Sequence, residues 1–343
     1  MKKAMPLIVG NDSLKQRLCG DILSDSLSHA YIIEGPDGSG RHTIALMAAA
    51  ALACESTKTE NAPLPCGTCA SCKKILEKKS PDVIILGNDG KSSIGVDIAR
   101  FIREDVHIIP NDLEHKIYII ENADKMTAQA QNALLLTLEE PPSFVHFFLL
   151  CNNADEFLET IRSRAPILRT ERIDNDLLGK YICSNDLRAA QLKSSSPKEY
   201  EELVLTASGG IGKALELLDP KVWKPIHEMR STVYDFVSFS VSGRGARHVL
   251  PALSKFSIKR DVLNNELLLL SDALRDLILL KKSDYAPLIF YSCRDEAISI
   301  CDRTTLNFLF GIQQSVSSAI DANKRNANVR LLLLKMAADA NLI

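Results

Sequence analysis

The residues of this chain with the clearest potential for chemistry lie in the stretch 31–43, which reads YIIEGPDGSGRHT. A short apolar strand is followed by a glycine-rich turn and then by the start of a long apolar helix. A loop of this kind can bind a phosphate, because its backbone N–H groups and the helix N-terminus both face the anion. The sequence therefore predicts a loop related to the phosphate-binding pattern G-x-x-x-x-G-K-[ST].

The loop departs from this pattern at the two positions that act on phosphate and metal. Arg41 replaces the lysine, and His42 replaces the hydroxyl that holds Mg²⁺, with Thr43 one position late. The loop could be a scaffold without ligand, or it could bind a nucleotide without hydrolysing it. It could also be an active ATPase site in which Arg41 supplies charge and Thr43 binds Mg²⁺, although arginine does not simply replace lysine. The glycine frame is complete at Gly35, Gly38 and Gly40.

A second set of polar residues follows the apolar strand predicted at 116–120. In nucleoside-triphosphatases such a strand ends in an Asp that holds Mg²⁺, and a neighbouring residue positions the attacking water. Here the strand ends in Glu121, and the next residue is Asn122, which cannot accept a proton. Asp124 is acidic, but a helix start also favours an acid at such a position. The sequence therefore predicts that the general base is missing.

Four cysteines form the array C-x11-C-x2-C-x2-C directly after the loop's helix. Zinc prefers four tetrahedral ligands, and C-x2-C turns bring pairs of thiolates to one ion. We therefore predict a structural Zn²⁺ module over residues 54–72. Buried cysteines without metal and a redox C-x-x-C pair are the alternatives. The predicted ligands are Cys54, Cys66, Cys69 and Cys72.

The composition is that of an ordinary soluble protein, with 343 residues, 46% hydrophobic and 24% charged residues, and a net charge of −2. This length favours two or three domains. The charge gives no overall signal for nucleic acid, so any DNA contact would be local or made by a larger assembly. Nine cysteines in a chain of this length are not typical of a disulfide framework. We find no secretion signal and no membrane span, and we expect a cytoplasmic protein without a membrane partner.

The pattern of apolar runs predicts an α/β fold followed by helices. Three to four apolar strands alternate with helices, which indicates a parallel sheet with the loop at its carboxyl end. The strand signals fade from about residue 172, and the remaining chain reads as helical. We expect an α/β domain at 1–171, a small helical domain at 172–220 and an all-α domain at 221–343 that mediates assembly.

These features together resemble bacterial replicative clamp-loader subunits. The most specific signal is the run QNALLLTLEEPP at 131–142, joined by the degenerate loop, the four-cysteine insertion and the pair Ser163-Arg164. Within this family the sequence looks most like the delta prime subunit of DNA polymerase III and less like the ATPase gamma/tau subunit. The resemblance covers the first 220 residues well and the C-terminal helices more loosely.

The resemblance implies an AAA+ P-loop domain, a three-helix lid and an all-α collar in a five-subunit ring. Such a ring opens the sliding clamp and places it on primed DNA, so the implied partners are the gamma/tau and delta subunits, the clamp and, through the complex, DNA. Active subunits hydrolyse ATP with the loop Lys, a Thr and an Asp-Glu pair, and this chain departs at each of them. The family therefore implies a non-hydrolysing structural subunit for which ATP and Mg²⁺ are absent or weak ligands, with an active gamma/tau-like ATPase as the alternative.

The resemblance also assigns a role to Arg164. The family's Ser-Arg-Cys motif reads Ser163-Arg164-Ala165 here, and its arginine reaches a neighbouring subunit's ATP site as a trans arginine finger. Without the resemblance, Arg164 would be interpreted as part of a surface ion pair. Lys213 lies where the lid's phosphate-sensing basic residue would fall, and Leu136 replaces a lysine that is usual in its helix.

Overall fold

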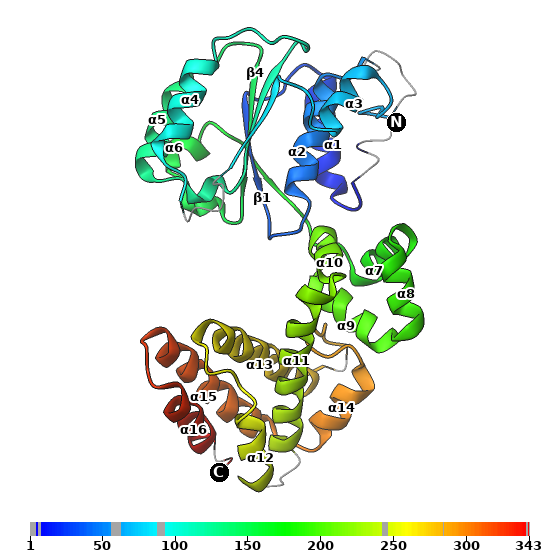
Figure 1. Cartoon of the computed structure of the whole chain (residues 1–343), viewed down its shortest axis with the longest axis vertical. Helices are drawn as coiled ribbons and strands as arrows, with labels where there is room; N and C mark the ends of the chain where they lie inside the picture. Colours follow the sequence, from blue (N-terminus) through cyan, green and yellow to red (C-terminus); the bar gives the residue numbers. More distant parts are fainter. Residues whose placement is uncertain are drawn as a thin grey trace. The chain divides into compact units, whose positions relative to one another are not determined.

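The computed structural model describes Met5, residues 8–55, 63–87, 93–241, 246–283 and 285–340, and Leu342. The chain divides into two compact units (Figure 1). The first contains Met1–Asp174 together with Gly210–Lys213, and the second contains Asn175–Gly209 and Ala214–Ile343. The finer division at residues 171 and 220 stays a prediction.

The first unit is built on a five-stranded parallel sheet with the strand order β2-β3-β4-β1-β5. The predicted parallel α/β architecture is therefore confirmed. The sequence reading missed β5, because a three-residue strand is too short to give an apolar run. The strands are β1 (Ala30–Glu34), β2 (Val83–Leu86), β3 (Lys116–Ile120), β4 (Val145–Cys151) and β5 (Ile167–Arg169).

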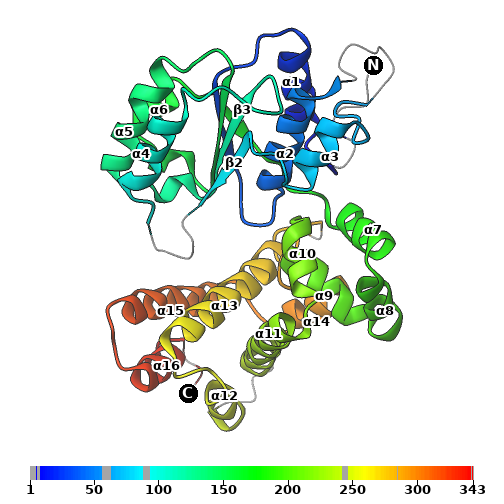
Figure 2. The same cartoon turned by 45° about the horizontal axis from the view of Figure 1, so that its top comes forward.

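Helices cover both faces of this sheet (Figures 1 and 2). The helices α1 (Asp12–Leu23), α2 (Arg41–Leu52) and α3 (Ala70–Leu76) lie on one face. The other face carries α4 (Val96–Asp105), α5 (Ala128–Glu139) and α6 (Glu159–Arg162). Side chains of a strand alternate between the faces, so that Ile33 packs with the first set and Ile32 with the second. Each face thus has its own apolar core.

All the regular secondary structure that is described in the second unit is helical. A single apolar core runs through its C-terminal helices, with Phe236, Leu270 and Val316 fully or almost fully buried. No described helix of the chain is long and apolar enough to span a bilayer. The helices are α7 (Asn175–Asn185), α8 (Leu187–Ser195), α9 (Pro197–Ala207), α10 (Ile211–Leu217, which begins in the first unit), α11 (Pro220–Val241), α12 (Ala246–Leu253), α13 (Arg260–Leu280), α14 (Arg294–Asp302), α15 (Leu306–Lys324) and α16 (Val329–Asp339).

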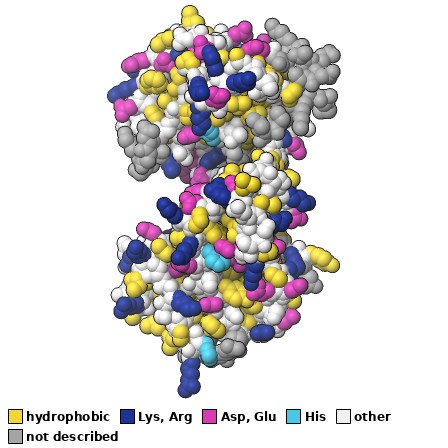
Figure 3. Space-filling view, turned by 45° about the vertical axis from the view of Figure 1, so that its right-hand side comes forward, with side chains coloured by type: hydrophobic (Ala, Val, Ile, Leu, Met, Phe, Trp, Pro, Cys, Tyr) yellow, Lys and Arg dark blue, Asp and Glu magenta, His cyan; other side chains and the backbone are white. Residues whose placement is uncertain are grey.

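The surface carries charges of both signs. On the face in Figure 3, Lys and Arg side chains intermingle with Asp and Glu side chains. This mixture agrees with the net charge of −2 and with the absence of an overall signal for nucleic acid in the composition.

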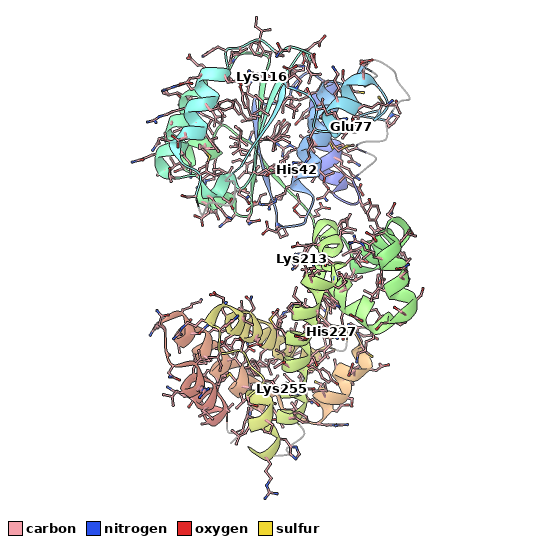
Figure 4. The ribbon with its side chains drawn as sticks, viewed as in Figure 1. His42, Glu77, Lys116, Lys213, His227 and Lys255 are labelled. Atoms are coloured by element: carbon pink, nitrogen blue, oxygen red, sulfur yellow. The ribbon has the colours of Figure 1, made fainter. Side chains whose placement is uncertain are left out.

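A buried lysine joins the start of β3 to the end of α4. Lys116, labelled in Figure 4, is 4% exposed, and its Nζ lies 2.7 Å from Asp105 Oδ2. Nζ also donates to the backbone carbonyls of Asp105 and Ile108. The Tyr118 hydroxyl donates to the same carboxylate at 2.6 Å. Burial acts against ionisation of Asp105, but the hydrogen bonds from Lys116 and Tyr118 lower its pKa overall.

We expect Lys116→Met to reduce the free energy of unfolding by about 2–4 kcal/mol, because it leaves a partly buried carboxylate and two carbonyls without their cation. Urea unfolding monitored by circular dichroism measures this loss. Lys125→Met is the matched control, since Lys125 is exposed, and should stay within about 0.5 kcal/mol of the parent chain. Equal effects of the two substitutions would contradict the proposed role of the buried pair.

Three histidines gather at the amino ends of three neighbouring strands. His29 precedes β1, His115 precedes β3, and His146 is the second residue of β4. The ring centroids of His115 and His146 are 5.1 Å apart, and those of His29 and His146 are 6.1 Å apart. Burial, together with the neighbouring histidines, lowers the pKa of His146 to about 4, although Asp25 acts in the opposite direction.

This pKa predicts a loss of stability in mild acid. Between about pH 6.5 and 4 the unfolded chain binds a proton at His146 that the folded chain does not bind, so the stabilising contribution is complete above that window and falls with pH. We expect a loss of about 2 kcal/mol between about pH 7.5 and pH 5. Urea unfolding at both pH values should show a smaller loss for His146→Gln. The exposed control His107→Gln should retain the parent's loss, and an identical loss in all three chains would refute the assignment to His146.

Candidate functional site

The phosphate-type loop lies at the carboxyl end of β1 and leads into α2. Gly38 and Gly40 have φ values of 79° and 88°, in the left-handed region that glycine adopts at little cost. A Cβ on Gly35 would lie 1.8 Å from Thr170 Oγ1, so only glycine fits there without rearrangement. Thr170 Oγ1 lies 3.0 Å from Ser39 Oγ, which ties the loop to the residue after β5. The predicted glycine frame therefore retains a defined shape.

The loop's own carboxylate pairs with its cation. An Arg41 guanidinium nitrogen, Nη2, lies 2.7 Å from Asp37 Oδ1, and the Arg41 side chain is only 11% exposed. Asp37 is 80% exposed at the side chain, so it reaches the guanidinium from the solvent side. One nitrogen of the guanidinium that would face an outer phosphate is thus already paired with a carboxylate of the loop.

The residues at the two metal-binding positions contact each other directly. His42 Nε2 lies 3.2 Å from Glu121 Oε1, with the side chains 29% and 39% exposed (His42 is labelled in Figure 4). Burial and the nearby Lys78 lower the pKa of His42, and Glu121 only partly offsets them. A neutral imidazole therefore faces the carboxylate where a hydroxyl and an Asp would share Mg²⁺ in an active site.

The other polar residues near the loop have structural partners or are exposed. Asn122 has a φ of 50° and forms the left-handed turn after β3, a conformation that asparagine tolerates better than most residues. The carboxylate of Asp124 accepts a hydrogen bond from the Asn152 backbone N–H at 2.9 Å, which links the ends of β3 and β4. Thr43 is exposed, and it lies about 100° around α2 from His42. Asn122 thus forms a turn, and Asp124 connects the ends of two strands.

Gly210–Lys213 groups with the first unit, and the backbone N–H of Gly212 donates to the Gly38 carbonyl at 3.2 Å. Lys213, labelled in Figure 4, follows directly. Its proposed role as a phosphate sensor stays a prediction.

The four predicted cysteine ligands form one compact cluster. The Sγ atoms of Cys54, Cys66, Cys69 and Cys72 all lie within 4.8 Å of one another, and those of Cys66 and Cys72 are 3.9 Å apart. Tetrahedral coordination with Zn–S bonds of about 2.3 Å requires sulfurs about 3.8 Å apart. The cluster is therefore consistent with a structural zinc site.

Backbone N–H groups point at three of these sulfurs. The N–H groups of Cys66, Cys69 and Cys72 donate to the Sγ atoms of Cys54, Cys66 and Cys69, each at 3.4 Å. The last of these bonds also caps α3, whose N-cap residue is Cys69. Such donors stabilise thiolates, whereas burial and the neighbouring Cys69 and Cys54 raise the pKa of Cys72. The chemistry of the donor set therefore suits a thiolate-binding cation.

Arg164 lies two residues after the end of α6, with its guanidinium held on two sides. Nη2 lies 2.7 Å from Glu139 Oε1 at the end of α5. Nη1 donates to the Thr160 carbonyl at 2.9 Å and contacts Ser163 Oγ at 3.3 Å. The Arg164 side chain is 38% exposed, so the guanidinium is partly open to solvent. Arg164 thus forms a surface ion pair and also has the solvent exposure that an arginine finger needs.

The sequence reading missed the two residues that organise this region. Gln131, only 3% exposed, donates from Nε2 to the carbonyls of Met126 and Glu156 and accepts from the Leu158 N–H at 2.8 Å. These bonds fasten the segment before α6 to α5. Gln131 and Glu139 both belong to the run at 131–142, and this run was the available signal.

Comparisons with known proteins place the first part of the chain beside DNA polymerase III subunits. The family model described as "DNA polymerase III, delta subunit" matches residues 10–174. DNA polymerase III subunit tau of Bacillus subtilis is 34% identical over 216 residues, which are 63% of this chain and 37% of that protein. Subunit tau of Escherichia coli is 28% identical over 215 residues, 63% of this chain and 32% of that protein. The chain thus matches only about a third of the length of these relatives.

A solved structure of a gamma-subunit-related protein of DNA polymerase III from Thermotoga maritima is also similar, with 17% identity and a TM-score of 0.46, covering 96% of this chain and 99% of that one. The family match and the relatives lead to one assignment. Residues 10–174 match the delta/delta prime family of DNA polymerase III clamp-loader subunits, and this part of the chain is similar to the gamma/tau subunits.

Proposed function

We propose that this chain is a non-hydrolysing structural subunit of the replicative clamp loader, which helps to open the sliding clamp and load it onto primed DNA. Its partners in this proposal are the gamma/tau and delta subunits, the clamp and, through the complex, DNA. The observation that carries the proposal is the direct His42–Glu121 contact, because it brings together the two positions that would share Mg²⁺ in an active site.

The state of the loop cation supports the same conclusion. In P-loop ATPases a lysine reaches the β- and γ-phosphates while a hydroxyl and an acid hold the metal. Here Arg41 pairs with Asp37, and His42 with Glu121. Asn122 offers no base, His42 offers no hydroxyl for Mg²⁺, and the loop's cation is already engaged by Asp37. This combination favours the non-hydrolysing subunit over the variant ATPase.

We expect the isolated chain to show no Mg²⁺-dependent ATP hydrolysis in a phosphate-release assay that detects turnover by a purified gamma/tau subunit. Calorimetry with ATP then distinguishes a loop that binds nucleotide from one that does not. Mg²⁺-dependent turnover that is lost in Thr43→Ala would support the alternative, an active ATPase with a variant loop, and would contradict the proposal.

The active chemistry of this chain would then lie at Arg164. We propose that its guanidinium reaches a neighbouring subunit's ATP and stabilises the charge of the transition state. Arginine fingers are worth about 10³–10⁵ in rate in GTPases. The partial exposure of Arg164 and its place just after a short helix support this role.

Arg164→Ala should lower clamp-stimulated ATP hydrolysis by the reconstituted complex while the complex still assembles, because one of its ATP sites loses a transition-state contact. Steady-state turnover and gel filtration measure the two quantities. Arg162→Ala is the matched control, since Arg162 lies in the same segment and pairs with Asp155 at 3.0 Å. Unchanged turnover in Arg164→Ala, or a loss in Arg162→Ala alone, would show that the finger is assigned to the wrong residue.

We propose that the four-cysteine cluster holds a structural Zn²⁺. The ion would join Cys54, which follows α2, to Cys72 of α3, and both cysteines pack in the apolar core of that face. Metal binding of this kind contributes about 10–16 kcal/mol in small zinc-finger peptides, which is enough to order a short insertion.

Metal analysis of the purified chain should find one zinc per molecule. Cys69→Ser should lose most of this zinc and lower the melting temperature, because three thiolates hold the ion less tightly, whereas serine can still cap α3. Cys293→Ser should retain the zinc, since Cys293 is exposed in the other unit. Full zinc content in Cys69→Ser would rule out the proposed ligand set.

We also propose that the second unit serves assembly, with a lid at 172–220 and a collar at 221–343. The continuous apolar core of α11 to α16 supports a firm helical module there. This division follows the family resemblance.

A further inference from the structure

Glu139 holds the guanidinium of Arg164 from a different helix. Its Oε1 lies 2.7 Å from Nη2, while Thr160 and Ser163 hold Nη1 from the arginine's own segment. The guanidinium is therefore fixed between the end of α5 and the end of α6. An arginine held on one side only could turn about its long side chain.

The support behind Glu139 is firm. Leu134 and Leu138 of α5 are buried in the core of that sheet face. Gln131 fastens the same helix to the segment that leads into α6. The backbone of α5 is thus fixed relative to the segment that leads into α6, and the carboxylate can direct the guanidinium.

The arrangement leaves donors for a ligand. A guanidinium carries five N–H groups, and the bonds to Glu139, Thr160 and Ser163 use at most three of them. The others have no hydrogen-bond partner among the residues that the structure describes. A guanidinium that is already oriented loses less freedom when it binds a phosphate oxygen, which favours the reactive geometry.

We propose that Glu139 is a positioning residue that orients Arg164 for the ATP of the neighbouring subunit. The proposal rests on the proposed function of Arg164 as a finger. It gives Glu139, the first glutamate of the sequence TLEEPP at 137–142, the role of orienting a neighbouring side chain. Because the pair is partly exposed, removing it should affect stability little, and the effect should be seen in the reaction.

The test uses the reconstituted clamp-loader complex with four versions of this chain: parent, Glu139→Gln, Arg164→Ala and the double variant. Clamp-stimulated ATP hydrolysis gives kcat and KM for each. Glu139→Gln should lower kcat about two- to fivefold with little change in KM. The double variant should be no slower than Arg164→Ala, because Glu139 acts only through that arginine.

Glu140→Gln is the matched control. Glu140 is the next residue, is exposed, and makes no ion pair with any residue that the structure describes. This substitution should leave kcat at the parent value, and gel filtration should show intact complexes for every variant.

The outcomes separate the two proposals. If Arg164→Ala lowers turnover and Glu139→Gln does not, the finger stands and the positioning role is wrong. Faster turnover in Glu139→Gln would show that the acid restrains the arginine, and an equal further loss in the double variant would show that it acts independently; both overturn the inference. If Arg164→Ala has no effect, the finger assignment itself fails, and the inference fails with it.

Discussion

The parallel pairing of β1 and β3 with β4 is the constraint on which the rest of the first unit depends. Parallel strands end at one edge of a sheet, so their polar end residues must meet there. This pairing brings His42, which follows the loop after β1, to Glu121 after β3, and it brings Asp124 after β3 to Asn152 after β4. The same strand order places α5 and α6 on one face, where Glu139 meets Arg164.

The loop at the carboxyl edge of the sheet has the shape of a phosphate-binding loop, but the polar side chains there form pairs with each other. Gly35 still meets Thr170 closely, and the left-handed glycines still turn the chain into α2. Arg41 with Asp37 and His42 with Glu121 form short internal pairs at the positions of the phosphate and the metal. In our proposal this edge of the sheet serves as a scaffold, because glycine conformation and side-chain chemistry are separate requirements.

Apolar runs and spacing predicted a large part of the fold and of the candidate site. The continuous apolar runs of β3 and β4 identified buried parallel strands, and the regular cysteine spacing identified a cluster that the structure confirms. The strand β5 was missed because three residues carry too little periodicity. The His42–Glu121 and Arg164–Glu139 contacts could not be predicted, since each joins residues far apart in sequence through particular side-chain rotamers.

The central claim is that this chain lacks a working ATP site and acts on a neighbour's. The most direct measurement follows nucleotide binding and hydrolysis together in a complex that carries Arg164→Lys, which keeps the charge but loses the planar fork. The account predicts that the amount of bound ATP is unchanged and that the single-turnover hydrolysis rate falls. Hydrolysis at the parent rate, with bound ATP equally unchanged, would contradict it.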